Sequence, residues 1–143
     1  MILIGIDPDV DKSGIAYYDT SDSSLELSNL SFFQLFDYLS WMKSEKINFK
    51  VVLEAGWKNE KSNWHNESSG SRVASLIGKS TGRNHETGRK IEEMLVYLMV
   101  EYELRIPSRE VHKLGKFEFN KLTKYKKQTN QDQRDAAMLV FGY

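Results

Sequence analysis

The chain has 143 residues, enough for one domain with a sizeable core and too few for two large lobes. It contains no cysteine, which excludes disulfides, thiolate nucleophiles and cysteine-ligated zinc, so any metal would be bound by oxygen or histidine ligands. The 20 basic and 20 acidic residues cancel, and no apolar run is long enough to span a membrane or is typical of a signal peptide, so we expect a cytoplasmic protein.

The balanced total hides an uneven distribution of charge along the chain. Acidic residues dominate positions 1–50, whereas basic residues dominate from Lys58 onward. A one-sided basic surface on a neutral protein is what contact with a nucleic-acid backbone requires, although a solvated lysine-rich face explains the charge equally well. The candidates for phosphate contact are Lys58, Arg72, Lys79, Arg83, Arg89, Lys113, Lys116 and Arg134.

The first segment, residues 1–6, is apolar at both alternating sets of positions, which predicts a strand buried on both faces. Gly5 leaves room in it for another backbone to approach. The strand ends at Asp7, and a carboxylate there is costly unless a cation or hydrogen bonds compensate its charge, so Asp7 is a candidate site residue. Residues 14–18 and 25–30 predict two further strands, so three antiparallel strands open the fold.

Ser31 and Gln34 have the spacing of a capping box, and apolar residues at helical spacing follow them. This pattern predicts a helix over residues 32–45 whose apolar stripe faces the core. Residues 49–53 predict a fourth strand, which also ends on an acid, Glu54. A helix between two such strands favours parallel pairing, which would bring Asp7 and Glu54 to the same carboxyl edge of the sheet.

The stretch 56–70 has no periodicity, and its length predicts a functional loop. Its Trp64 and His65 would stack on a nucleobase or pack onto the protein with equal plausibility. Helical periodicity resumes at residue 73 and continues to about residue 103, but glycines interrupt it, so we expect two helices or one with a weak joint. At this glycine-rich joint, where backbone can come close to a phosphate, the sequence places Arg83, His85 and Arg89.

Residues 104–107 predict a short final strand, and residues 108–129 form a basic connector without a clear period. Thr129 and Asp132 have capping-box spacing, which predicts a last helix beginning there. Asp132 and Asp135 then project from the same side of its first turn. Taken alone, this pair is better explained structurally, because the helix dipole stabilises acids near an N-terminus.

Two acids at strand ends and two at the start of a helix change that balance. Four carboxylates gathered in one place repel one another and require divalent cations, and an all-oxygen ligand set favours magnesium or manganese over zinc. Asp7, Asp9 and Asp11 also mimic the start of an EF-hand calcium loop, but Lys12 stands where that loop needs glycine and Tyr18 where it needs glutamate. An ATPase of the actin and sugar-kinase type would need a duplicated domain that this length cannot hold.

Three short stretches carry a family resemblance when taken in order. They are Gly5-Ile6-Asp7-Pro8 with Ser13-Gly14 downstream, Val52-Leu53-Glu54, and Asp132-x-x-Asp135-Ala136. Together they resemble the RuvC-type Holliday junction resolvases of the RNase H-like superfamily, enzymes of DNA recombination and repair. The resemblance implies one α/β domain over residues 1–143, with a five-stranded mixed sheet in RNase H-like order, its first three strands antiparallel, and helices on both faces.

The resemblance also implies a homodimeric, metal-dependent endonuclease that cuts branched DNA, above all four-way junctions. By position, Asp7, Glu54, Asp132 and Asp135 look like the metal-binding acids of that family. Two magnesium ions, for which manganese would substitute, supply the chemistry of phosphodiester hydrolysis in such a site. The dimer interface would come from helix 91–99, although the same apolar stripe would equally pack the core of a monomer.

Two departures from the family pattern leave the substrate open. Asp9 stands where the family carries glycine, and residues 84–89 are unlike the commonest bacterial members, which indicates a divergent branch. The alternatives are another RNase H-like nuclease that acts on flaps, replication forks or RNA, and a non-catalytic nucleic-acid-binding module.

Overall fold

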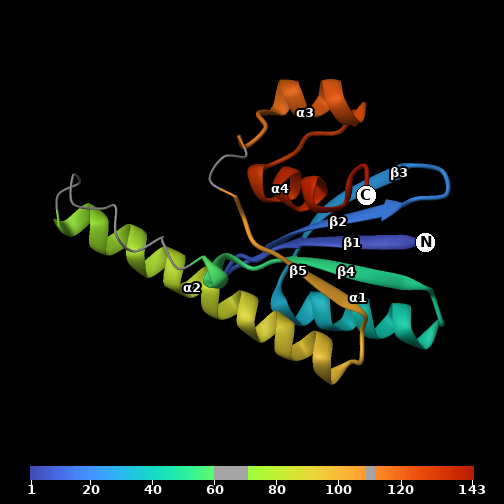
Figure 1. Cartoon of the computed structure of the whole chain (residues 1–143), viewed down its shortest axis with the longest axis horizontal. Coiled ribbons are helices and arrows are strands. Elements are labelled where there is room, and N and C mark those ends of the chain that lie inside the picture. The colour runs from blue at the N-terminus through green and yellow to red at the C-terminus, as the bar shows by residue number, and fades with distance from the viewer. Residues whose placement is uncertain (60–70, 109–111) are drawn as a thin grey trace.

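A five-stranded sheet lies between two helical layers in the computed structural model, which describes residues 1–59, 71–108 and 112–143 (Figure 1). Its strands follow one another in space in the order β3-β2-β1-β4-β5. The bounds are β1 (Ile2–Asp7), β2 (Ser13–Asp19), β3 (Ser24–Leu30), β4 (Phe49–Glu54) and β5 (Tyr102–Arg105).

The strand directions are mixed, as the sequence predicts. β2 is antiparallel to both of its neighbours, β1 and β3, while β1 pairs with β4 and β4 with β5 in parallel. The predicted antiparallel opening therefore holds for neighbouring pairs only: β1 and β3 run in the same direction, and β2 alone is reversed relative to the other four strands. The parallel pairing of β1 with β4 confirms that Asp7 and Glu54 share one edge of the sheet.

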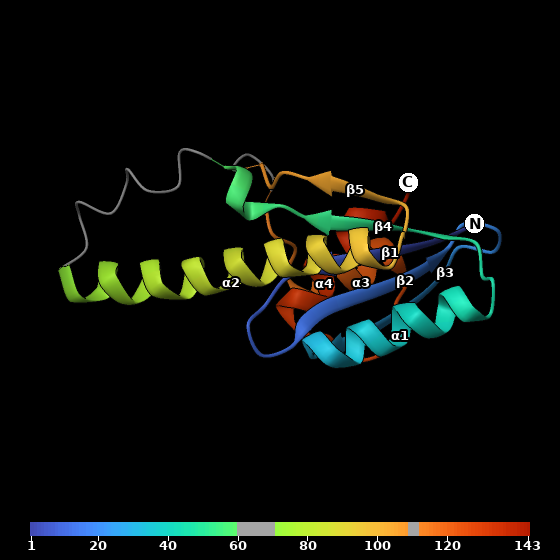
Figure 2. The same cartoon turned by 90° about the horizontal axis from the view of Figure 1, so that it is seen from below.

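Helices cover both faces of this sheet. α1 (Phe32–Ser44) and the C-terminal part of α2 (Ser71–Tyr97) lie on one face, and α4 (Gln131–Val140) lies on the other, with α3 (Lys116–Thr123) beyond it (Figures 1 and 2). The N-terminal part of α2 extends past the edge of the sheet (Figure 2). A short 3-10 turn, η1 (Gly56–Lys58), follows β4 and contacts α2.

Each face of the sheet has its own apolar core. Ile4 and Ile6 point toward α1 and α2, where they pack in one cluster with Leu35, Leu39, Met42, Ile91, Met94 and Leu95. Leu3 belongs to the opposite cluster, with Val52, Phe119, Ala136, Ala137 and Val140. Successive residues of β1 thus enter opposite clusters, which confirms the predicted strand buried on both faces. The apolar area buried on each side is the main stabilising contribution.

The helix ends differ from the prediction in two places. α2 is one continuous helix, because an interior glycine costs a helix only about 1 kcal/mol. It also ends at Tyr97 rather than near residue 103. Met99 adopts a left-handed conformation with φ of 52°, and the N–H groups of Met99 and Val100 bond back to the carbonyls of Val96 and Leu95, the pattern that closes a helix.

The caps of the other helices are resolved as well. Ser31 and Gln34 form the predicted capping box of α1. The last helix is capped by Asn130 with Gln133, not by Thr129 with Asp132 as predicted, so Asp132 has no capping role. The predicted strand 104–107 is instead β5, and the connector 108–129 contains α3. Among the described residues, no helix combines the length and apolarity that a membrane span requires.

Candidate active site

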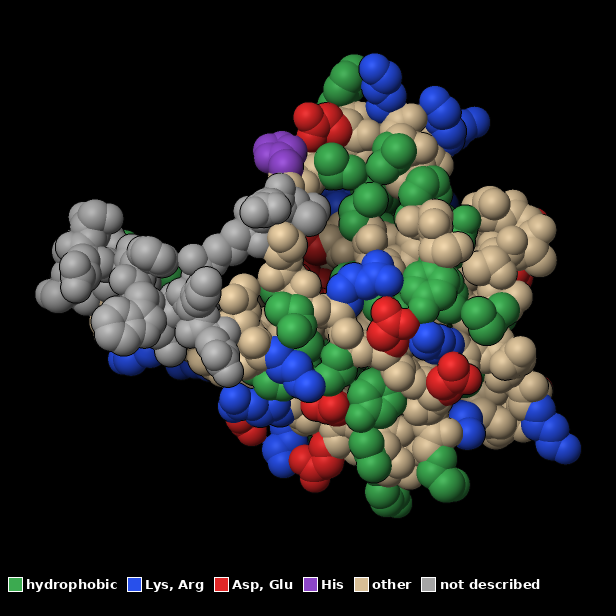
Figure 3. Space-filling view, viewed as in Figure 1, with side chains coloured by type: hydrophobic (Ala, Val, Ile, Leu, Met, Phe, Trp, Pro, Cys, Tyr) green, Lys and Arg blue, Asp and Glu red, His purple; other side chains and the backbone are tan. Residues whose placement is uncertain are grey.

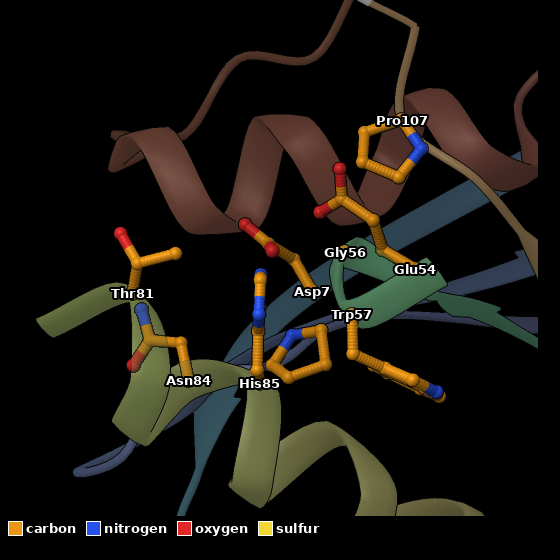
Figure 4. Close-up of a pocket in the computed structure, with 9 residues that line it drawn as sticks. Asp7, Glu54, Gly56, Trp57, Thr81, Asn84, His85 and Pro107 are labelled. Carbon is orange, nitrogen blue, oxygen red and sulfur yellow. The ribbon is translucent and has the colours of Figure 1, made fainter. Parts of the chain in front are cut away.

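The carboxyl edge of β1 and β4 brings the two strand-terminal acids together. Ile6 pairs with Leu53 in the parallel ladder, and the next residue on each strand is an acid, Asp7 or Glu54. Figure 4 shows both carboxylates at the rim of a cavity, below the ribbon of α4.

Close contact between α4 and the sheet adds the remaining two acids. Gly14 pairs with Asp7 across β1 and β2, and a Cβ at Gly14 would clash with the backbone carbonyl of Asp132. A Cβ at Gly5 would likewise clash with the carbonyl of Ala136, one turn further along α4. The two glycines therefore let the first turn of α4 lie directly on the sheet beside Asp7, which explains the predicted close approach at Gly5.

The pKa of Asp7 reports this crowding of carboxylates. Burial, a hydrogen bond to Glu54, and the negative charges of Glu54, Asp135 and Asp132 together raise the pKa of Asp7 to about 9. A carboxyl group in a partly apolar site among like charges favours its neutral form, and Asp7 then donates the hydrogen bond to Glu54. Asp7 therefore lies within electrostatic range of the other three predicted acids.

Asp132 shows the same effect more weakly and gives Asp9 a role. The pKa of Asp132 is raised by burial, then by the charges of Asp9 and Asp135. Asp9 itself accepts a hydrogen bond from the N–H of Asp11 at 3.0 Å, and its own N–H donates to Ser13 at 3.2 Å. Asp9 therefore shapes the β1–β2 turn while adding negative charge beside Asp132.

Asp135 is held by two partners. Lys113 Nζ lies 2.6 Å from Asp135 Oδ2, and Gln131 Nε2 donates to Oδ1 at 2.7 Å. The side chain of Asp135 is only 13% exposed, so this ion pair partly offsets the charge of the acidic group. Lys113, predicted as a phosphate contact, thus binds an acid of the site in this structure.

The donor chemistry of the four acids fits divalent cations. All ligand atoms are carboxylate oxygens, and their mutual repulsion, seen in the raised pKa of Asp7, is what bound cations relieve. In this structure, however, no three histidine, aspartate or glutamate side chains among the described residues are close enough together to hold one ion. A magnesium centre remains a prediction.

A cavity of about 180 Å³ opens beside Asp7 and Glu54, and its far wall comes from α2 (Figure 4). Most of the lining was not predicted from the sequence as part of a site: Thr81 and Asn84 of α2, and Pro8, Gly56, Trp57 and Pro107 from other segments. A signal was present, because residues 81, 84, 85 and 88 have the spacing of one helix face and lead into the buried Ile91. The expected joint in the helix hid that stripe.

Apart from Lys113, the predicted phosphate contacts fall into three groups. Lys58, Lys79, Arg83 and Lys116 are exposed, and Arg89 is exposed with its Nη1 3.6 Å from Glu86. Arg134 instead donates four hydrogen bonds within the protein, to the carbonyls of Leu114 and Thr129, the hydroxyl of Thr129 and the side chain of Gln131. It anchors the 114–129 segment, so we remove it from the phosphate contacts. The side chain of Arg72 lies outside the described residues, as do Trp64 and His65.

Basic side chains do not form one continuous patch on the face in Figure 3, where they alternate with acidic and apolar ones.

Comparison with protein-family models finds no match for the chain, and comparison with curated proteins finds no relative. Any functional assignment therefore rests on the residues and their geometry.

Proposed function

We propose that the protein is a magnesium-dependent, structure-specific DNA endonuclease of the RuvC type that cuts four-way junctions. The observation that carries this proposal is that Asp7 and Glu54 lie at one edge of the sheet and the first turn of α4, with Asp132 and Asp135, packs beside them. A structural role explains one such acid readily. Four converging carboxylates repel one another and lower the stability of the fold, which favours a functional role for them.

The architecture supports the same proposal. The strand order β3-β2-β1-β4-β5, with only β2 reversed, is consistent with an RNase H-like fold. Asn130 and Gln133 supply the cap of α4, so Asp132 is not needed for capping, although it keeps a favourable position in the first turn of the helix. Asp132 is thereby left available for ligands, whereas Asp135 would have to exchange its contacts with Lys113 and Gln131.

Asp7, Glu54, Asp132 and Asp135 would hold the magnesium ions, which when bound supply Lewis-acid activation of water and neutralise charge on the scissile phosphate. The chain's own residues prepare that site. Asp7, whose raised pKa favours the protonated form, has to lose its proton before it can bind a cation. Lys113 balances part of the remaining negative charge through its ion pair with Asp135. The exposed Lys58, next to the site in η1, would contact the DNA backbone.

The proposal includes a homodimer, with a changed interface. Ile91, Met94 and Leu95 pack in the core of their own chain, so they are not free to bind a partner. Val96 and Tyr97 at the end of α2 are 60% and 77% exposed, and they border an apolar groove with Phe33 of α1, which is also 77% exposed. We assign the dimer contact to this groove.

The test is a cleavage assay with end-labelled four-way junctions, three-way junctions, flaps, linear duplex and RNA, with magnesium or with chelator. The wild type should nick four-way junctions only with the metal. Asp7→Asn should lose at least about 100-fold in rate, because it removes a ligand charge. Asp37→Asn, an exposed acid on α1, is the matched control and should cleave normally.

The pattern of cleavage also decides between the alternatives. Preferential cutting of flaps, forks or RNA would replace the junction assignment with another RNase H-like nuclease activity. Metal-independent binding without cleavage of any substrate, unchanged in Asp7→Asn, would contradict the enzyme proposal and favour a binding module.

A further inference from the structure

His85 is a polar group that the proposed metal chemistry does not use. It lies on α2, is partly buried, and lines the cavity opposite the acids. Figure 4 shows its ring rising from α2 toward the carboxylate of Asp7, with Asn84 and Thr81 beside it. Within the part of the chain that the structure describes, no hydrogen bond or ion pair involves either ring nitrogen.

The surrounding contacts hold this ring in place. A Cβ at Gly56 would lie 3.1 Å from His85 Nε2, so the ring lies against the backbone of η1. The ring of Trp57 occupies the space where Gly88 lacks a side chain, which joins η1 to α2 one turn further on. Asn84 Oδ1 accepts a hydrogen bond from Val10 N–H at 3.1 Å, which joins the β1–β2 turn to the same helix.

The ring of His85 lines the cavity opposite two acids and has no hydrogen bond to the described residues, so its N–H is available to a ligand in that cavity. Burial, and then the charge of Arg89, lower the pKa of His85, so the ring is neutral near pH 7 and keeps one N–H donor. Asp7 and Glu54 face it across the cavity.

We propose that His85 contacts the substrate by donating a hydrogen bond to a non-bridging oxygen of the phosphodiester bound beside Asp7 and Glu54. This inference rests on the proposed nuclease function. The phosphate would then be held between the acidic group with its cations on one wall and a neutral donor on α2 on the other. A neutral donor suits this place, because it adds no charge that would compete with the cations for the carboxylates.

The first test compares His85→Ala with His85→Gln in single-turnover cleavage of a four-way junction. Loss of the donor should lower the maximal rate by roughly 10- to 100-fold, while affinity for the junction, measured with calcium in place of magnesium, changes by less than about threefold. The glutamine amide can donate from a similar position, so His85→Gln should recover most of the rate. Gly82→Ala, an exposed position on the same helix, is the control and should cleave like the wild type.

The second test does not depend on cleavage. The imidazole ¹⁵N signals of His85, assigned by their loss in His85→Gln, should shift when a short single-stranded oligonucleotide is added with calcium, and should not shift with calcium alone. An inactive wild type with this shift would refute the nuclease but retain the contact. Full activity in His85→Ala, equal losses of rate and melting temperature in both variants, or no ¹⁵N shift would each overturn the inference.

Discussion

At the scale of single residues, the raised pKa of Asp7 makes the stability of the fold depend on pH. Its pKa of about 9 means that the folded protein keeps a proton at neutral pH that an unfolded chain, with a pKa near 3.8, has lost. The folded state therefore binds more protons between these values, and the stability contributed by Asp7 is fully present below pH 3.8 and is lost as pH rises through about 9. Asp132, whose pKa is also raised, acts in the same direction.

Asp7→Asn should consequently be more stable than the wild type in chelator at alkaline pH. Asparagine retains hydrogen-bonding capacity without a titrating charge, so the difference in unfolding free energy should grow by up to about 1.4 kcal/mol per pH unit between roughly pH 5 and pH 9. Urea denaturation at several pH values measures it. Asp37→Asn, exposed on α1, should leave the pH profile unchanged, and parallel profiles for the wild type and Asp7→Asn would contradict the electrostatic account.

The environment of Asp9 shows why its role could not be assigned from sequence. An acid after Asp-Pro suggests either a ligand or a solvated turn, and both are compatible with the spacing. Only the structure shows that Asp9 bonds to Asp11 and Ser13 while its charge raises the pKa of Asp132.

At the scale of elements, the position of α4 on the sheet decides whether the site exists. Its backbone lies against Gly5 and Gly14, where any side chain would force helix and strands apart. The glycines on α2 are different, because Gly78 and Gly82 have no neighbouring atoms where a Cβ would stand. The same residue type thus has opposite consequences in two elements.

Gly14→Ala should destabilise the protein by roughly 1–3 kcal/mol, because the added Cβ overlaps the backbone of Asp132 and cannot be relieved by a side-chain rotation. Gly78→Ala, the matched control, should instead stabilise it by about 0.5–1 kcal/mol through better helix propensity. Thermal unfolding in the same buffer compares the two. If both substitutions shift the melting temperature in the same direction, the close packing of α4 is not what Gly14 provides.

At the scale of the whole molecule, the apolar groove beside Phe33, Val96 and Tyr97 is where a second copy is proposed to bind. Large apolar side chains exposed around one groove differ from single apolar residues scattered over a surface. A partner that covers the groove removes all of them from water at once, so the free energy of binding is larger. The sequence left two roles open for the apolar residues of this helix, core packing and dimer contact. The residues that pack on the sheet are Ile91, Met94 and Leu95, so the proposed dimer contact is assigned to other residues of α2.

Tyr97→Lys should therefore convert the dimer to a monomer without unfolding it, since Tyr97 is 77% exposed in the single chain. Multi-angle light scattering gives the mass, and circular dichroism checks the fold. Phe117→Lys, an equally exposed aromatic on α3, should leave the mass unchanged. A wild-type chain that is monomeric at all concentrations, or a dimer that survives Tyr97→Lys, would refute this interface.

The sequence by itself determined the features that depend on neighbours along the chain. The apolar run at residues 1–6, the Ser31 box, and the acids at two strand ends and one helix start are local signals. They predicted the first four strands, the first helix and the four acids of the candidate site, while the last strand lies two residues earlier than predicted. These signals are local because strand and helix periods arise from the geometry of consecutive residues.

Tertiary structure alone decided where those elements stop and what surrounds the acids. α2 ends at Tyr97, and Met99 just after it takes a left-handed conformation without being a glycine, because packing of Leu95 and Val100 on the sheet outweighs that local cost. The raised pKa of Asp7 and the position of His85 depend on segments that meet only when α2 and α4 close on opposite faces of the sheet. Burial and long-range contacts set these properties, and the spacing of residues 81, 84, 85 and 88 indicates a shared helix face without showing what that face contacts.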